Sequence, residues 1–102
     1  MKAYATQNPG AIDEELAASL CQHSRLLIDS GENDRAIVAI KESSHLYEEL
    51  ANNYPERFNE EYADSLDVLR ECLTEAGRDE EAREVRERVT TLRGTGQKEV
   101  SV

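Results

Sequence analysis

One segment of the chain occurs twice in succession, and this duplication restricts the possible folds more than any other feature. Residues 9–54 align with residues 55–100 at a constant shift of 46 positions. The identical pairs are Pro9 and Pro55, Glu14 and Glu60, Glu15 and Glu61, Ala17 and Ala63, Ser19 and Ser65, Leu20 and Leu66, Leu27 and Leu73, Gly31 and Gly77, Ala36 and Ala82, and Leu46 and Leu92. A repeated unit of this length is typical of helix pairs that stack on one another.

The composition favours helices over strands. The chain has 102 residues, of which 38% are hydrophobic and 33% charged, enough for one small domain. Four tyrosines, one phenylalanine and no tryptophan leave Leu, Ile, Val and Ala to form the core. Strand-like alternation of apolar and polar residues is absent. We therefore expect an all-α fold.

Capping residues and helix breakers divide this fold into four helices. Asp13 suits an N-cap, Gly31 ends the first helix, and the short turn after it folds the next helix back antiparallel. Pro55 breaks the second helix, Asn59 suits the next N-cap, and Gly77 makes the second turn. The predicted helices cover about residues 13–30, 34–53, 59–76 and 79–92.

The same signals divide the chain into four segments. We interpret residues 9–54 and 55–94 as two helix-turn-helix repeats. Residues 1–8 are either the end of a preceding repeat or a disordered N-terminus. The last helix has only a narrow apolar stripe, as expected of a helix that caps an array, and residues 95–102 are predicted to be a disordered tail.

The net charge of −10 limits the partners. Residues 9–54 contain three basic and nine acidic residues, and residues 55–94 contain seven basic and twelve acidic residues. Such a surface repels nucleic acid and anionic membranes, so a protein or peptide of basic character is the better partner. No apolar run is long enough to span a membrane, and residues 1–10 lack the apolar core of a secretory signal, which predicts a cytoplasmic protein. We expect Cys21 and Cys72 to be reduced and semi-buried.

The positions of large and small residues within each helix pair resemble the tetratricopeptide repeat, in its long-period variety. In the first repeat the resemblance rests on Leu20, Leu27, Gly31, Ala36, Ile37 and Ile40, and in the second on Leu66, Leu69, Leu73, Gly77 and Ala82. It covers about residues 12–93 and implies two hairpins stacked as a short right-handed α-solenoid. His23, Ser24, Arg70 and Arg86 depart from the family pattern. The alternative is a four-helix bundle that arose by duplication.

The resemblance also implies a binding surface, because the first helices of such repeats line a concave groove for peptides or helices. The positions carried over are Ala18, Cys21, Arg25, Ile28 and Asp29 from the first helix, and Asp64, Asp67, Val68, Glu71 and Glu75 from the third. The four acidic residues of the third helix are spaced three or four apart and form one stripe. A cationic ligand would relieve their mutual repulsion. The alternative interpretation is a solvated face of an acidic protein.

No pattern indicates catalysis. The chain has no phosphate-binding glycine loop, no paired-histidine zinc motif and no Ser or Cys in a nucleophile context. His23 and His45 share no helical register with a carboxylate pair that would complete a metal site. We expect no enzymatic activity, no cofactor and no metal.

These observations favour a protein–protein interaction module that binds a basic peptide or helix on the concave face. Two repeats are fewer than a stable stack usually needs, so an exposed first helix with Leu16, Leu20 and Leu27 would meet either a second copy of the chain or further repeats of a longer array. One alternative is a four-helix unit that associates with a second copy to form a dimer. Another is a regulatory fragment of a larger signalling ATPase or protease.

Overall fold

The computed structural model describes residues 11–101, with side chains described for residues 13–94. Its helices are α2 (Ala11–Asp29), α3 (Asn33–Asn53), α4 (Pro55–Glu75) and α5 (Asp79–Ser101). No strand occurs within residues 11–101, so the predicted all-α fold is confirmed. Residues 1–8, interpreted above as a repeat end or a disordered N-terminus, lie outside the described residues.

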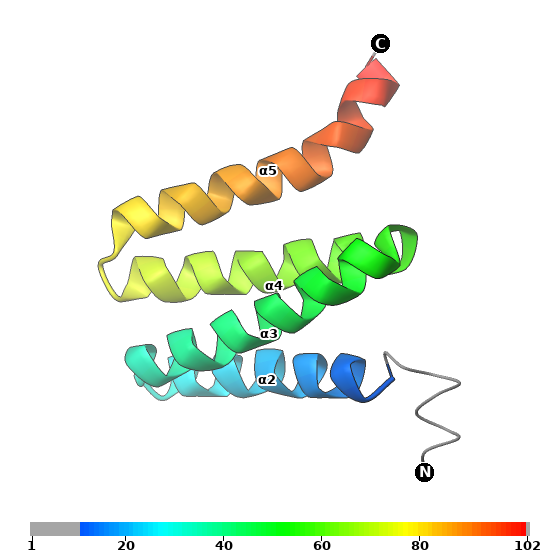
Figure 1. Ribbon diagram of the computed structural model, residues 1–102. Coiled ribbons are helices and arrows are strands. Elements are labelled where there is room, and N and C mark those ends of the chain that lie inside the picture. The colour runs from blue at the N-terminus through cyan, green and yellow to red at the C-terminus, as the bar shows by residue number, and fades with distance from the viewer. Residues whose placement is uncertain (1–10, 102) are drawn as a thin grey trace.

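Consecutive helices pack against each other in an open stack (Figure 1). α3 packs on both α2 and α4, and α5 packs on α4. α2 and α4 run in the same direction and share a smaller contact. Within the described part of the chain, α2 and α5 share no comparable interface, so the helices do not close into a ring. The first helices of the two repeats therefore lie side by side.

The two hairpin turns have the same geometry, as the duplication requires. Gly31 and Gly77 have φ angles of 81° and 78°, a left-handed conformation that residues with a Cβ adopt at a cost. In each turn the glycine N–H and the next N–H donate to carbonyls three and five residues back, at 2.8–3.0 Å. Open space surrounds a Cβ built at either position, so backbone conformation alone requires glycine there.

The junction between the repeats differs from the prediction. α4 begins at Pro55, and the expected start near Asn59 is wrong. Proline suits the first helical position, because its φ is already helical and the N–H it lacks has no partner within a helix. Tyr54 alone separates α3 from α4, and its carbonyl accepts hydrogen bonds from the N–H groups of Arg57 and Phe58 at 3.1 and 3.0 Å.

The outer helix ends also differ from the prediction. α2 begins at Ala11, so Asp13 lies in its first turn and is not the N-cap. α5 continues to Ser101, so the predicted helix end near residue 92 is wrong, and the segment 95–102 that was interpreted as a tail is helical as far as Ser101. Gly94 does not adopt the left-handed conformation that ends a helix at Gly31 and Gly77. The local cost of a helical glycine, about 1 kcal/mol, does not stop the helix there.

The core lies along the middle of the stack. Its buried hydrophobic residues are Ala17, Leu27, Ala36, Ile37, Ala39, Ile40, Tyr47, Leu50, Ala51, Phe58, Tyr62, Ala63, Leu66, Val68, Leu69, Cys72, Leu73, Ala82 and Val89. Most of them belong to α3 and α4, since each of these helices is contacted from two sides. The hydroxyl of Ser43 joins α3 to α2 by donating to the Ala17 carbonyl at 2.7 Å.

The exposed face of α2 is not the one expected. Leu16 is 45% exposed, as predicted, and Leu20 is half-buried against the core. Leu27 is buried, so its predicted exposure is wrong, and the adjacent Leu26 is 62% exposed instead. One residue along a helix rotates the side chain by about 100°, which is enough to exchange the interior for solvent.

Candidate functional site

The predicted concave face contains a groove of about 340 Å³ between α2 and α4. Its lining residues are Ala18, Cys21, Gln22, Arg25, Tyr47, Glu61, Asp64 and Ser65. The structure therefore brings together Ala18, Cys21, Arg25 and Asp64 from the predicted set. Sequence reasoning missed the other four. Of these, Glu61 lies three residues before Asp64, so helical spacing alone could have found it.

Val68 was predicted to face a partner, and this is wrong. Its side chain is 4% exposed and belongs to the core. Ile28 is half-buried and packs against the same core, whereas Asp29 is exposed at the end of α2. The groove therefore offers fewer apolar contacts than the sequence indicated.

The acidic stripe on α4 already has a counter-ion. The Arg93 guanidinium of α5 donates to the carboxylates of Asp67 at 2.8 Å and Asp64 at 2.6 Å. Its Nε lies 3.6 Å from a Glu60 carboxylate oxygen, and Asp67 also lies 3.8 Å from Arg70. The hydrogen bond to Asp67 is the main cause of the raised pKa of Arg93. The chain itself thus relieves the repulsion at this end of the stripe.

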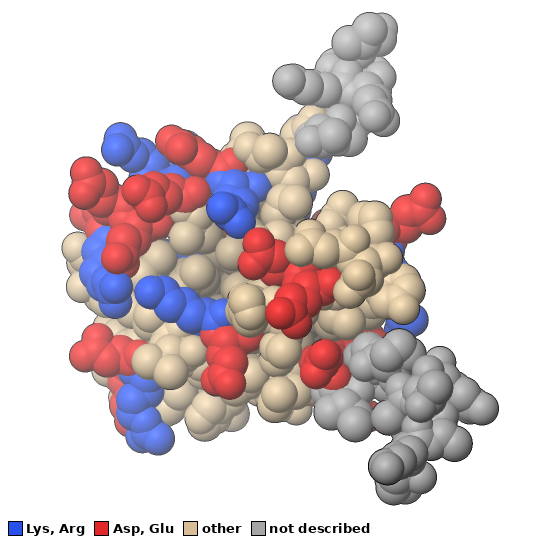
Figure 2. Space-filling view, viewed as in Figure 1, with Lys and Arg blue, Asp and Glu red and all other residues tan. Residues whose placement is uncertain are grey.

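The other end of the stripe has no such partner. Glu71 and Glu75 are exposed and form no ion pair with the described residues. At the opposite end of α2 and α4, Arg57 bonds to Glu14 at 3.1 Å and links the two helices. On the face drawn in Figure 2, acidic and basic side chains are interspersed, so the net charge does not gather into one patch there. Glu71 and Glu75 are therefore unpaired carboxylates near the C-terminal end of α4, as Glu56 and Glu61 are nearer its start, within the described residues.

The two cysteines have different environments, and neither forms a disulfide. Cys21 is half-buried at the groove, whereas Cys72 is fully buried. Burial is the main cause that raises the pKa of Cys72 to about 11, with a smaller contribution from Glu71. The Cys72 thiol is therefore protonated at neutral pH and behaves as a small core residue.

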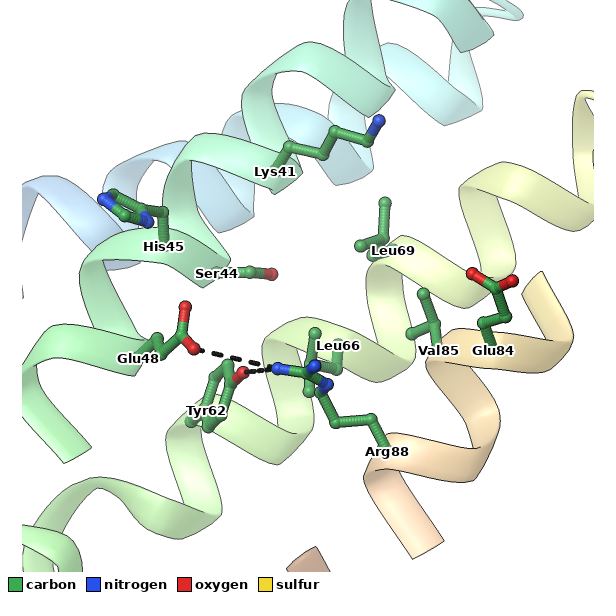
Figure 3. Close-up of a pocket in the computed structure, with 10 residues that line it drawn as sticks. All are labelled: Lys41, Ser44, His45, Glu48, Tyr62, Leu66, Leu69, Glu84, Val85 and Arg88. Atoms are coloured by element: carbon green, nitrogen blue, oxygen red, sulfur yellow. Dashed lines mark hydrogen bonds and ion pairs between the residues drawn. The ribbon is translucent and has the colours of Figure 1, made fainter. Parts of the chain in front are cut away.

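A second groove, of about 380 Å³, lies on another side of α4, where α3, α4 and α5 meet (Figure 3). Its lining residues are Lys41, Ser44, His45, Glu48, Tyr62, Leu66, Leu69, Glu84, Val85 and Arg88. Arg88 donates to the Tyr62 hydroxyl at 3.1 Å and lies 3.7 Å from Glu48. The bond to Tyr62 is the first cause of the raised pKa of Arg88. Sequence reasoning did not anticipate this groove.

The described residues contain no group of three or more His, Cys, Asp and Glu side chains that could hold a metal ion. Within the same part of the chain, no helix combines the length and apolar character needed to cross a membrane. His23 and His45 are both exposed, and His45 lies 3.4 Å from Glu49 on its own helix.

Comparison with known proteins found no match to this chain among family models, curated proteins or solved structures.

Proposed function

We propose that the chain is an interaction module that binds an extended segment of a basic partner protein along the groove between α2 and α4. The arrangement of α2 and α4 supports this proposal, because two parallel helices present Ala18, Cys21, Arg25 and Asp64 around one groove. The two free thiols fit a reducing compartment such as the cytoplasm.

Charge sets the orientation of the bound segment in this proposal. Basic side chains of the partner lie over Glu71 and Glu75, the two carboxylates of the predicted acidic stripe that form no ion pair with the described residues. Arg93 competes with the partner at the other end, since it already holds Asp64 and Asp67. A partner cation placed there contributes less binding free energy, because it must first displace Arg93 from Asp64 and Asp67.

Charge changes at matched positions test the groove. Labelled peptides rich in lysine and arginine are titrated with the protein and followed by fluorescence anisotropy. We expect Glu71→Lys to weaken binding about fivefold to tenfold. Glu42→Lys is the control, because Glu42 is exposed on α3, outside the acidic stripe of α4, while the change in net charge is the same. Arg93→Gln, which removes the competing cation, should strengthen binding about twofold to threefold. Equal weakening by Glu71→Lys and Glu42→Lys would mean that binding follows net charge and not the acidic stripe that extends from this groove along α4.

Self-association is a second candidate function, favoured by the exposure of Leu16 and Leu26 on α2. A dimer formed through this face would bury both leucines. Sedimentation equilibrium of the wild type and of Leu26→Glu tests this candidate. A wild type that stays monomeric at high concentration would exclude it.

A further inference from the structure

The groove between α3, α4 and α5 contains a buried polar atom that lacks a partner. The Ser44 hydroxyl oxygen is buried and has no hydrogen-bond partner, and it is the one such side-chain atom found in the described part of the chain. Ser44 is 6% exposed, and its hydroxyl points into the cavity (Figure 3). The other buried serines, Ser24, Ser43 and Ser65, each donate to a backbone carbonyl at 2.7 Å. A buried hydroxyl without a partner is costly, and it needs an explanation in a native structure.

A second hydroxyl in the groove has a proton to donate. The oxygen of Tyr62 accepts a hydrogen bond from Arg88 at 3.1 Å, which leaves its own O–H as a donor. Tyr62 is 6% exposed, and the hydrogen bond of its hydroxyl to Arg88 is partly buried, so this donor lies at the edge of the buried floor. Leu66 and Leu69 lie beside it on α4, and Val85 faces them from α5. The floor therefore combines two hydroxyl donors with an aliphatic surface.

The charged residues around this floor balance one another. Lys41 and Arg88 contribute two positive charges, and Glu48 and Glu84 contribute two negative ones. Arg88 and Glu48 are already close, at 3.7 Å, whereas Lys41 and Glu84 form no ion pair with the described residues. A ligand with a net charge would leave one member of this set without compensation. A neutral group that both accepts and donates hydrogen bonds matches the set better.

We propose that this groove binds a carboxamide, the side chain of an asparagine or glutamine of a partner polypeptide. The amide oxygen accepts from the hydroxyls of Ser44 and Tyr62, and the amide nitrogen donates to the carboxylate of Glu48, which lies on the same side of the groove as these hydroxyls (Figure 3). The aliphatic stem of the side chain packs on Leu66 and Leu69. This site is separate from the groove between α2 and α4 and uses none of its lining residues.

Three small probes with similar alkyl stems test the chemistry of the site. Butanamide is neutral, butanoate is negative and butylammonium is positive at pH 7. Each is titrated at millimolar concentration, and the backbone amide signals of residues 41–48, 62–69 and 84–88 are followed by two-dimensional NMR. We expect butanamide to shift these signals in a saturable way and the two charged probes to shift them at least threefold less at equal concentration.

Variants tie the effect to the unpartnered hydroxyl. Ser44→Ala should abolish the butanamide shifts, and Tyr62→Phe should reduce them. Ser19→Ala is the matched control, because Ser19 is exposed on α2, away from the groove, and its variant should bind as the wild type does. A charged probe that binds as well as butanamide, a Ser44→Ala variant that binds unchanged, or the absence of shifts with all three probes would each overturn the proposal. Glu71→Lys should leave the butanamide shifts intact, so the two proposed sites can fail independently.

Discussion

Two adjacent serines of α3 should respond in opposite ways to the same substitution. Ser43 and Ser44 are both buried, at 0% and 6% exposure. The Ser43 hydroxyl donates to the Ala17 carbonyl at 2.7 Å, whereas the Ser44 hydroxyl has no partner. Replacing serine by alanine in a helix interior gains roughly 0.5 kcal/mol of helix propensity at either position. The two variants therefore differ in whether the hydroxyl that they remove made a hydrogen bond.

The hydrogen bond sets the expected magnitude. Ser43→Ala removes a buried bond between α2 and α3, worth about 1–1.5 kcal/mol, so after the gain in propensity the free energy of unfolding should fall by about 0.5–1 kcal/mol. Ser44→Ala removes a hydroxyl whose lack of a partner costs about 1–3 kcal/mol, so the free energy of unfolding should rise by at least about 1 kcal/mol. The two variants should thus differ by about 2 kcal/mol. For a domain of this size that corresponds to roughly 8–16 °C in melting temperature.

Urea unfolding followed by circular dichroism at 222 nm measures this difference. The slope of the free energy against urea concentration should be equal in both variants, because neither changes the surface exposed on unfolding. If Ser44→Ala lowers the free energy of unfolding as much as Ser43→Ala does, the Ser44 hydroxyl is bonded in solution. That result would contradict the unpartnered state of the Ser44 hydroxyl and the binding of a carboxamide to it.

Four further predictions concern the turns, the two thiols and the ion-pair cluster. Gly31→Ala and Gly77→Ala should each lower the free energy of unfolding by about 1 kcal/mol, because alanine is strained at positive φ; two unchanged urea midpoints would contradict this. At pH 8 a thiol reagent should modify Cys21 and leave Cys72 unmodified in the folded protein, as peptide mass spectrometry can check. Burial raises the pKa of Cys72 from 9.0 to about 11, so the protonated thiol of the folded state contributes fully to stability below pH 9. This contribution is lost as the pH rises through 11, and urea midpoints measured across that range should fall accordingly. Arg93→Ala should cost less than about 1 kcal/mol, because the ion pairs of Arg93 are partly exposed, and 1 M NaCl should abolish the difference from the wild type; a loss that persists in salt would point to packing instead.

Sequence patterns predicted the all-α fold and the two glycine turns, because each depends on residues close together in the chain. The part of the groove lining that was predicted, Ala18, Cys21, Arg25 and Asp64, came from the resemblance of the two repeats to a known family. A glycine between two helical patterns indicates a turn, and Gly31 and Gly77 both lie in such positions. The helix starts were predicted less well. Asp13 and Asn59 are good capping residues, yet α2 and α4 begin at Ala11 and Pro55. Helix ends depend on small differences between competing caps, so tertiary packing can move them by several residues.

Taken alone, the amino-acid sequence determined the repeat, the helical periodicity and the negative charge. Tertiary structure decided the burial of Val68, the ion pairs of Arg93 with Asp64 and Asp67, and the missing partner of Ser44. The physical reason is that each of these depends on how one helix is rotated against another. Arg93 and Asp64 are 29 residues apart, and only the packing of α5 on α4 brings their charges within 2.6 Å.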